Sequence, residues 1–446
     1  MSLVAPLVVL GGGIAALGVH LHAFRAWRRT ADRLGLSFSE SSFWGDWVIY
    51  GELRGCRIRV ENLQSRLQRR GRFTRVTVTG SERISSGISL KPESIITAAR
   101  KLIEGEDVQV GDAEFDARIH MQGREEILLA VLDARTRGTV RRFFSTWRGE
   151  VAGGEVLRDA RTVIRRASTL ERLLLDAVRL AESVQVPEGG YWEALLRNLE
   201  RDPQPGVRRR CLGLLLGRDG RIRDRAIELG VADPDASIRL EAATAAGVAG
   251  GAVLRALLDE PGGATAALAL ERLVAAVPEV GLAQVAAVLA RGPGRLTATA
   301  ARLAGLAGLQ DSEGRLQLFV GHPDAAIAAA AADALAALGD PAAEAALVRA
   351  LEHPVAEVRT HAARALGEVG TLAAVQPLLA LGARGHARAE AREAVQRIQG
   401  RHARAGAGAL AVVRASQAGE LALGPEGGGS ASSTTEGVGQ KAQEKQ

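Results

Sequence analysis

Proline recurs at intervals of about 30 residues through the second half of the chain, and this period constrains the fold more than any other feature. The prolines that mark the period are Pro203, Pro234, Pro261, Pro293, Pro323 and Pro354. Three of them stand in closely similar segments, Asp202–Arg208, Asp233–Arg239 and His353–Arg359. A fixed period of this length indicates a repeat protein, in which each unit is one supersecondary element that stacks on its neighbours.

Each repeat unit carries the signals of a pair of helices. Proline favours the first turn of a helix, because its missing N–H would have no partner there. An aspartate before the proline accepts hydrogen bonds from the free N–H groups of that turn. Alanines at helical spacing let paired helices approach closely, and a glycine ends the helix in a left-handed turn, as in the unit 353–379. One pair cannot bury its apolar face alone, so the units are expected to stack into an α-solenoid over residues 185–400.

The three proline segments, together with Ala362–Gly367, resemble the short HEAT-repeat family of bacterial phycobilin-lyase-like proteins. The third and fourth units are degenerate, and a weak last unit spans His386–Gln399. The resemblance implies a curved scaffold whose concave face binds a protein partner. Some relatives are similar to enzymes that attach or isomerise bilins, which makes a bilin-lyase-like HEAT protein an alternative. No pattern carries that chemistry here, since Cys211 falls on an expected buried helix face and no aromatic-lined pocket is indicated.

An arginine recurs at one position of the repeat, five residues after the proline, as Arg208, Arg239 and Arg359. A ligand-binding role is one interpretation. Recurrence at a single repeat position favours instead a structural role, in which each side chain pairs with acidic or carbonyl groups between repeats. We therefore expect these arginines to be inter-repeat structural residues.

The amino terminus is an apolar run without a charged side chain from Leu3 to Phe24. A run of about 20 residues is enough for a helix to cross the hydrocarbon core of a bilayer. Arg25, Arg28 and Arg29 follow at once with Trp27 among them, which is typical of a cytoplasmic flank at headgroup height. The sequence predicts a transmembrane anchor over residues 1–24, single-pass in the inner membrane, with the bulk of the chain cytoplasmic. A cleaved signal peptide is disfavoured, because no basic residue precedes the run.

The same run offers a second interpretation, a dinucleotide- or flavin-binding turn. Gly11, Gly13 and Ala16 fit the pattern G-x-G-x-x-G/A after an apolar stretch. Such a turn places the N–H groups of a helix against a pyrophosphate. It also requires an acidic residue about 20 positions later, at the end of a second strand. The nearest candidate, Glu40, lies farther from Gly13 than this spacing allows, so we expect no cofactor at this site.

Residues 25–184 show the periods of a small α+β domain. Segments 47–53 and 56–61 alternate apolar and polar side chains around a two-residue turn, which predicts a hairpin, and 72–79 is a third strand of this kind. Helices are expected over 92–105, 125–144 and 170–184, with strands again over 108–121. The whole chain is thus predicted to be an α-solenoid of HEAT-like helix pairs, preceded by a small α+β domain and one transmembrane helix. Within the domain, 108–116 resembles a segment found before helical repeats in some bacterial membrane-anchored proteins, a resemblance that implies no activity.

Four acidic residues lie within ten positions of this domain: Asp107, Asp112, Glu114 and Asp116. Hard cations prefer several oxygen ligands, so a divalent-cation site is one interpretation. The order of a calcium loop is missing, and acidic residues that alternate along a half-exposed strand explain the pattern better. His120 has no second histidine or cysteine at metal-ligand spacing, which favours a structural histidine. We predict no metal site.

The net charge of +6 lies in one part of the chain, since residues 25–80 hold twelve arginines and five acids, an excess of +7. The solenoid is therefore nearly neutral, which disfavours nucleic acid as a partner. The basic residues nearest the predicted anchor are candidates for contact with anionic lipid: Arg25, Arg28, Arg29, Arg66, Arg69, Arg70 and Arg72. A solvated loop at 64–72 is the alternative interpretation.

The last segment, 401–446, is predicted to be a degenerate hairpin followed by a disordered tail. Two similar short apolar stretches begin at Gly408 and Gly419, and the rest is rich in Gly, Ser, Thr and Gln. The sequence as a whole predicts a membrane-anchored HEAT-repeat scaffold, which mediates protein–protein interaction on the cytoplasmic face and is not an enzyme. An enzyme is the alternative, either a dinucleotide- or flavin-binding protein or a bilin-lyase-like protein.

Overall fold

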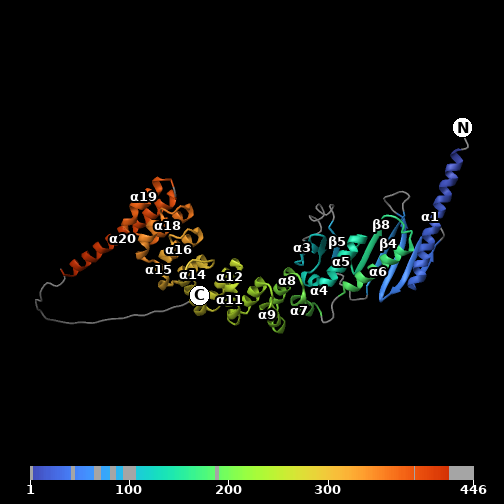
Figure 1. Cartoon of the computed structure of the whole chain (residues 1–446), viewed down its shortest axis with the longest axis horizontal. Coiled ribbons are helices and arrows are strands. Elements are labelled where there is room, and N and C mark those ends of the chain that lie inside the picture. Colours follow the sequence, from blue (N-terminus) through green and yellow to red (C-terminus); the bar gives the residue numbers. More distant parts are fainter. Residues whose placement is uncertain are drawn as a thin grey trace, which may run out of the picture. The chain divides into compact units, whose positions relative to one another are not determined.

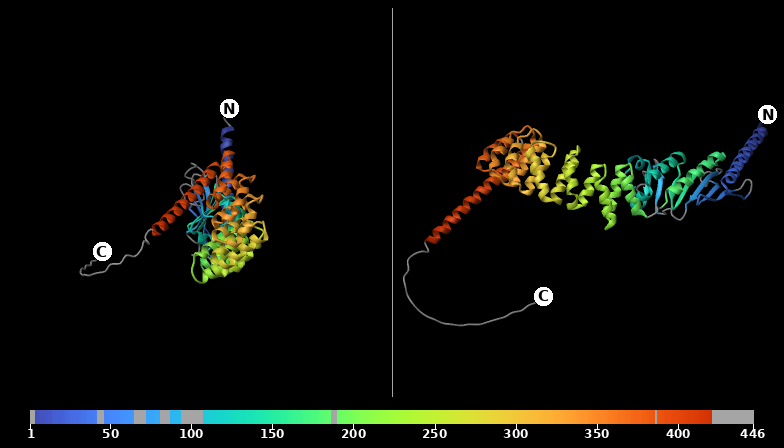
Figure 2. Two further views of the ribbon diagram at one scale, coloured as in Figure 1. Left: turned by 90° about the vertical axis from the view of Figure 1, so that its left-hand side faces the viewer. Right: turned by 60° about the horizontal axis from the view of Figure 1, so that its bottom comes forward.

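The computed structural model describes residues 4–41, 46–64, 72–80, 87–93, 107–185, 190–385 and 387–420. The chain divides into two compact units, Met1–Gly281 and Leu282–Gln446. The first unit holds an antiparallel sheet, the helices that cover it and the first helical repeats (Figure 1). The second unit is helical in all of its described elements (Figure 2).

The eight strands of the described residues form one antiparallel sheet in the order β1-β2-β3-β4-β8-β7-β5-β6. The predicted hairpin pairs β2 with β3, and its turn residues Arg54 and Gly55 both have positive φ, 53° and 74°. A two-residue type I′ turn matches the twist of the two strands it connects, and it requires positive φ at both of its central residues. The strands are β1 (Ser37–Glu40), β2 (Trp47–Leu53), β3 (Cys56–Gln64), β4 (Arg72–Thr79), β5 (Ser89–Pro92), β6 (Ile119–Gln122), β7 (Glu150–Ala152) and β8 (Glu155–Ala160).

The predicted transmembrane anchor is wrong. Residues Val4–Leu34 form one helix, α1, and no helix among the described residues is long and apolar enough to cross a membrane. The second half of α1 packs on protein, where Trp27 is fully buried and its Nε1 donates to the carbonyl of Ile164 at 2.9 Å. The aromatic side chain that sequence patterning assigned to the headgroups therefore belongs to the core. The prediction of a single-pass inner-membrane protein depended on this anchor and is therefore also wrong.

The strand and turn that the dinucleotide-binding interpretation requires are not formed around Gly11, Gly13 and Ala16. The three residues lie inside the continuous helix α1, so among the described residues no strand precedes them and no turn leads into the helix at this point. A pyrophosphate site needs the free N–H groups of a helix N-terminus, and those of residues within a helix are already paired.

The helices of the α+β part are α1, α3 (Ala113–Asp116), α4 (Glu125–Val131), α5 (Ala134–Trp147) and α6 (Ala167–Ser183). α6 packs against β3, β4 and β8, and also against α1. The helix expected over 125–144 is interrupted because Asp133 begins a new helix, its carboxylate accepting from the N–H of Thr136 at 2.7 Å. The strand expected over 108–121 is formed by Ile119–Gln122 alone, and most of the helix expected over 92–105 lies outside the described residues.

The repeats of the first unit follow directly from the α+β part. Their helices share one continuous core with it, which runs from Ala23 to Ala242. Short 3₁₀ turns connect some of these helices, η1 (Gly247–Gly250) and η2 (Leu257–Asp259). The helices are α7 (Tyr191–Arg201), α8 (Pro205–Leu216), α9 (Arg221–Val231), α10 (Ala236–Ala245), α11 (Gly251–Ala256) and α12 (Gly263–Ala276), while α13 (Pro278–Arg291) spans the boundary between the units.

The second unit repeats a pair of helices with the period of the sequence. Leu316, Leu347 and Leu378 occupy one position of the second helix in each pair, and all three are fully buried. The first helices stack on one another in the order α14, α16, α18, α20, and each second helix packs on the first helix that follows it (Figure 1). The elements are α14 (Thr297–Ala307), η3 (Gln310–Ser312), α15 (Glu313–Phe319), α16 (Ala325–Leu338), η4 (Pro341–Ala343), α17 (Glu344–Ala350), α18 (Ala356–Val369), η5 (Leu372–Ala374), α19 (Val375–Ala383) and α20 (Arg388–Glu420).

The hairpin predicted after residue 400 is also wrong, because α20 continues as a helix to Glu420. The spacing from Gly408 to Gly419 is close to three turns of an α-helix at about 3.6 residues per turn, so a repeat of this length suits one continuous helix as well as a hairpin. The segment is rich in alanine, the best helix former. The predicted disordered tail lies outside the described residues.

Candidate functional site

The recurrent arginines bind the loops that connect the repeats. Arg208 donates from Nε and Nη2 to the carboxylate of Asp233, at 2.8 and 2.9 Å, and from Nη1 to the carbonyl of Asp202 at 2.9 Å. Arg239 donates to the carbonyl of Asp233 at 2.7 Å and forms an ion pair with Glu260. Each of these two arginines therefore joins the start of its own repeat to an acidic residue of the next.

Arg359 makes the same contact with the start of its own repeat. Its Nη1 donates to the carbonyls of His353 and Pro354, at 2.6 and 2.9 Å. Its Nε is buried without a hydrogen-bond partner among the described residues. All three arginines thus donate to the carbonyl six residues earlier, a local contact that fixes the loop before the helix.

A fourth arginine, Arg137 in α5, has the same chemistry and was not identified from the sequence. It donates from Nη1 and Nη2 to the two carboxylate oxygens of Asp202, both at 2.9 Å, and from Nε to Asp112 at 2.9 Å. The side chain of Arg137 is 2% exposed. The signal was present, because Asp133 and Arg137 have the same spacing as Asp235 and Arg239 in the repeats. These ion pairs join the α+β part to the first repeat.

Three of the four clustered acids, Asp112, Glu114 and Asp116, have separate structural roles. Asp112 accepts from the N–H of Phe115 and pairs with Arg137, while Asp116 accepts from the N–H groups of Val110 and Gly111, both at 3.0 Å. Burial raises the pKa of Asp116 above its usual value. Glu114 is exposed and pairs with two arginines, Arg118 and Arg141. The prediction that these acids alternate along a strand is wrong, because Asp112 caps α3 and both Glu114 and Asp116 lie within it.

The basic residues near the predicted anchor divide into three sets. Arg25, Arg28 and Arg29 are exposed on the side of α1 that faces away from the core. Arg72 is half-buried and pairs with Asp46 at 3.1 Å. The remaining three, Arg66, Arg69 and Arg70, lie outside the described residues.

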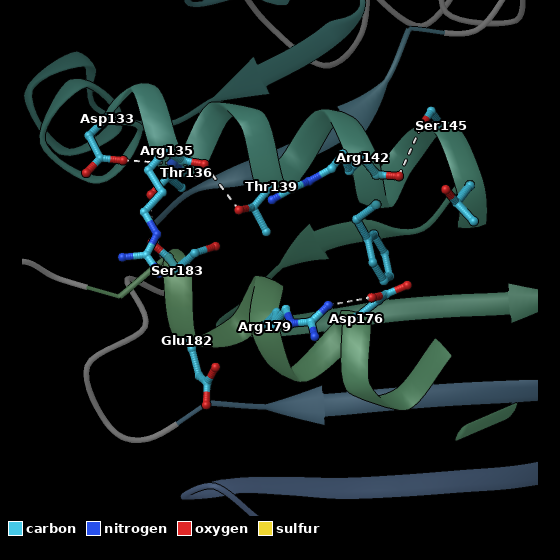
Figure 3. A pocket seen from close by; sticks show the side chains of 12 residues that line it. Asp133, Arg135, Thr136, Thr139, Arg142, Ser145, Asp176, Arg179, Glu182 and Ser183 are labelled. Carbon is cyan, nitrogen blue, oxygen red and sulfur yellow. Dashed lines mark hydrogen bonds and ion pairs between the residues drawn. The ribbon is translucent and has the colours of Figure 1, made fainter. Parts of the chain in front are cut away.

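A polar pocket of about 770 Å³ lies between α5 and α6 (Figure 3). Its hydroxyl groups donate to backbone carbonyls: Thr139 to Arg135 at 3.1 Å and Ser145 to Arg142 at 3.0 Å. Its carboxylate Asp176 pairs with Arg179 at 3.2 Å. A hydroxyl nucleophile needs a base within hydrogen-bond reach, and none of the described hydroxyls lining this pocket has one.

The second helices of the second unit carry a surface with exposed leucines. Two adjacent positions recur in the second helix of each repeat. We call the residues at these positions the second-helix surface: Gln317 and Leu318, Val348 and Arg349, and Leu379 and Ala380. Leu318 is 69% exposed and Leu379 is 50% exposed. Between α15 and α17 this surface contains a groove of about 330 Å³, with Leu318, Ala346 and Ala350 as its apolar wall and charged groups at its edge, Arg349 and Glu352.

The first helices of the second unit carry a different surface chemistry. Exposed charges on α18 and α20 pair across the two helices, Arg397 with Glu368 and Arg364 with Glu390. The half-buried ring of His361 on α18 contacts Asp333 on α16 at 2.7 Å. We call these residues the first-helix face. A partner that covered it would have to desolvate charges that already have partners.

The two cysteines are both buried and free. Burial raises the pKa of the Cys211 thiol well above its usual value, and the pKa of Cys56 is raised by the same cause. The thiolate is the reactive form, so neither cysteine is placed to attach a chromophore.

Comparison with known proteins identifies the repeats. Residues 312–398 match the sequence profile of HEAT repeats, which confirms the predicted α-solenoid of HEAT repeats in this part of the chain. Among solved structures, human deoxyhypusine hydroxylase in complex with glycerol matches at 18% sequence identity and a TM-score of 0.21, over 47% of this chain and 96% of that one. A similarity at this TM-score supports no conclusion about this chain. No curated protein sequence matches.

Proposed function

We propose that the chain is a non-catalytic scaffold that binds a protein partner through the second-helix surface. The observation that carries the proposal is the exposure of Leu318 and Leu379 on α15 and α19, at adjacent positions of a regular repeat. Helical repeats stack into extended surfaces, and repeat proteins use such surfaces for binding.

The contrast between the two surfaces of the unit supports the choice of surface. On the second-helix surface, burial of a leucine adds apolar contact area, and fully burying one such side chain contributes about 1.5–3 kcal/mol. On the first-helix face, an incoming partner would compete with ion pairs such as Arg397 with Glu368. The groove beside Leu318 also has the size to accept one apolar side chain of a partner, with Arg349 and Glu352 available for polar contacts at its edge.

The test compares three variants of the full chain as affinity baits in extracts of its source cells. Leu318→Glu and Leu379→Glu place a charge on the second-helix surface, and Leu306→Glu places the same charge on α14, where Leu306 is 74% exposed. We expect a specific partner that the wild-type chain and Leu306→Glu retain and that the other two variants lose. If all four chains retain the same proteins in the same amounts, the proposal fails.

A further inference from the structure

Three side chains that are distant in the sequence meet beside β6. β5 pairs with β6, and just after this pairing the N–H of Glu93 donates to the carbonyl of Arg118 at 2.7 Å. On the other side of β6, the N–H of Val108 donates to the carbonyl of Met121 at 3.0 Å. These two pairings bring together Glu93, Asp107 and His120, from three separate segments of the chain.

The atoms of this cluster are close enough to share one ion. One carboxylate oxygen from Glu93, one from Asp107 and one ring nitrogen of His120 all lie within 4.8 Å of one another. Zinc binds nitrogen and oxygen ligands at about 2.0–2.2 Å, so two ligands in tetrahedral geometry are about 3.4 Å apart. Nδ1 of His120 and Oδ1 of Asp107 are 3.1 Å apart, near that separation.

The environment of His120 is a second and independent observation. Its side chain is 2% exposed, and its Nδ1 has no hydrogen-bond partner among the described residues although Asp107 is only 3.1 Å away. The distance suits a hydrogen bond but the direction does not. Oδ1 of Asp107 already accepts from the N–H of Met121 at 2.9 Å. Buried polar atoms in folded proteins nearly always have a partner, so this nitrogen requires an explanation.

We propose that Glu93, Asp107 and His120 bind a divalent first-row transition-metal ion, for which Zn²⁺ is the probe. A neutral imidazole nitrogen suits zinc and its neighbours, whereas calcium and magnesium prefer oxygen ligands throughout. Asp107 is held in place by the N–H of Met121, which orients it as a ligand. Glu93 is exposed and Asp107 half-buried, so the site opens to solvent and water completes the coordination.

The test uses the full-length chain, freed of metal with a chelator and then titrated with Zn²⁺ by calorimetry, with the metal content measured by mass spectrometry. Asp107→Asn and Glu93→Gln remove one charged ligand each with little change in shape. Asn keeps an oxygen that accepts from Met121. The control is Glu114→Gln, which removes an exposed acid of the same domain that lies outside the cluster. Circular dichroism checks that every variant is folded.

We expect one Zn²⁺ per wild-type chain and per Glu114→Gln chain, and affinities at least about 10-fold weaker for the two ligand variants, since even residues that only support ligands contribute that much. Binding of Zn²⁺ with equal affinity to the wild-type chain and both ligand variants would place the metal elsewhere and overturn the proposal. Absence of binding to the wild-type chain would overturn it as well, and would leave a poorly aligned ion pair between His120 and Asp107 as the explanation.

Discussion

The buried ion pairs of Arg137 make a quantitative prediction about the joint between the α+β part and the repeats. In Arg137→Met the side chain keeps its apolar stem and loses its charge, while Asp112 and Asp202 stay buried with 7% and 1% of their side chains exposed. Removing one partner of a buried pair leaves an uncompensated charge and costs about 3–5 kcal/mol. We expect a loss of this size in the free energy of unfolding of the first unit.

An exposed arginine that binds both oxygens of one carboxylate supplies the control. Arg75 donates to both carboxylate oxygens of Asp159 at 2.8 and 2.7 Å, but the side chains are 43% and 50% exposed. Exposed pairs contribute about 0–1 kcal/mol, because water and salt screen the charges. Arg75→Met should therefore cost no more than about 1 kcal/mol. The two variants differ in burial and in the number of carboxylates that lose their partner, two for Arg137 and one for Arg75.

Tryptophan fluorescence in urea measures the effect in the first unit, because all five tryptophans of the chain precede residue 281. The midpoint and slope of each transition give the change in unfolding free energy. A second variant, Arg137→Met with Asp202→Asn, should recover part of the loss, since the charge left unpaired on Asp202 is removed. If Arg137→Met destabilises the unit no more than Arg75→Met does, the reasoning from burial is refuted.

Three further predictions concern single positions. Gly206→Ala should destabilise the first unit by about 1–3 kcal/mol, because its Cβ would lie 2.2 Å from the carbonyl oxygen of Gly111. Gly213→Ala in the same helix meets no backbone atom and should stabilise it by about 0.5–1 kcal/mol, so equal effects in urea unfolding would contradict the packing argument. Asp235→Ala should cost about 1 kcal/mol at neutral pH. Hydrogen bonds from Ser237 lower the pKa of Asp235 below its ordinary 3.8, so its contribution is present above that value and is lost as the pH falls through the folded pKa. Urea unfolding of both chains at neutral pH and at about pH 3 checks this, and a cost that stays constant would contradict it. Cys211 should resist alkylation in the native chain and react in urea, as mass spectrometry of the modified chain would show, because it is fully buried.

The period of the sequence predicted the repeats because each repeat is a local structure. A buried position such as Leu347 has its counterparts one repeat away in each direction, at Leu316 and Leu378, and one pattern of burial recurs without long-range information. The hairpin of β2 and β3 was equally accessible, since alternation and the Arg54-Gly55 turn are local signals. The HEAT-repeat character of residues 312–398 follows from this same local pattern.

The errors arose where one pattern fits two environments. A run of small apolar residues ending in Trp27 and arginines suits a bilayer, and it equally suits a helix that packs on a sheet and exposes its basic side. Composition does not distinguish a lipid tail from a protein core, because both are apolar. The cluster of Glu93, Asp107 and His120 was inaccessible for another reason: the pairing of β5 with β6 brings it together, and no spacing in the sequence indicates that pairing.

The arginine geometry explains how the repeats begin. A solenoid needs a cap at its ends, since the first repeat would otherwise expose the apolar face meant for a neighbour. Here α4 packs against α7 and α8 (Figure 1). Arg137 pairs with Asp202, and Arg208 pairs with Asp233 one repeat later. The α+β part therefore presents to the first repeat the same ion pair that one repeat presents to the next. Because the core is continuous across this joint, the α+β part acts as the cap of the solenoid and not as a tethered neighbour.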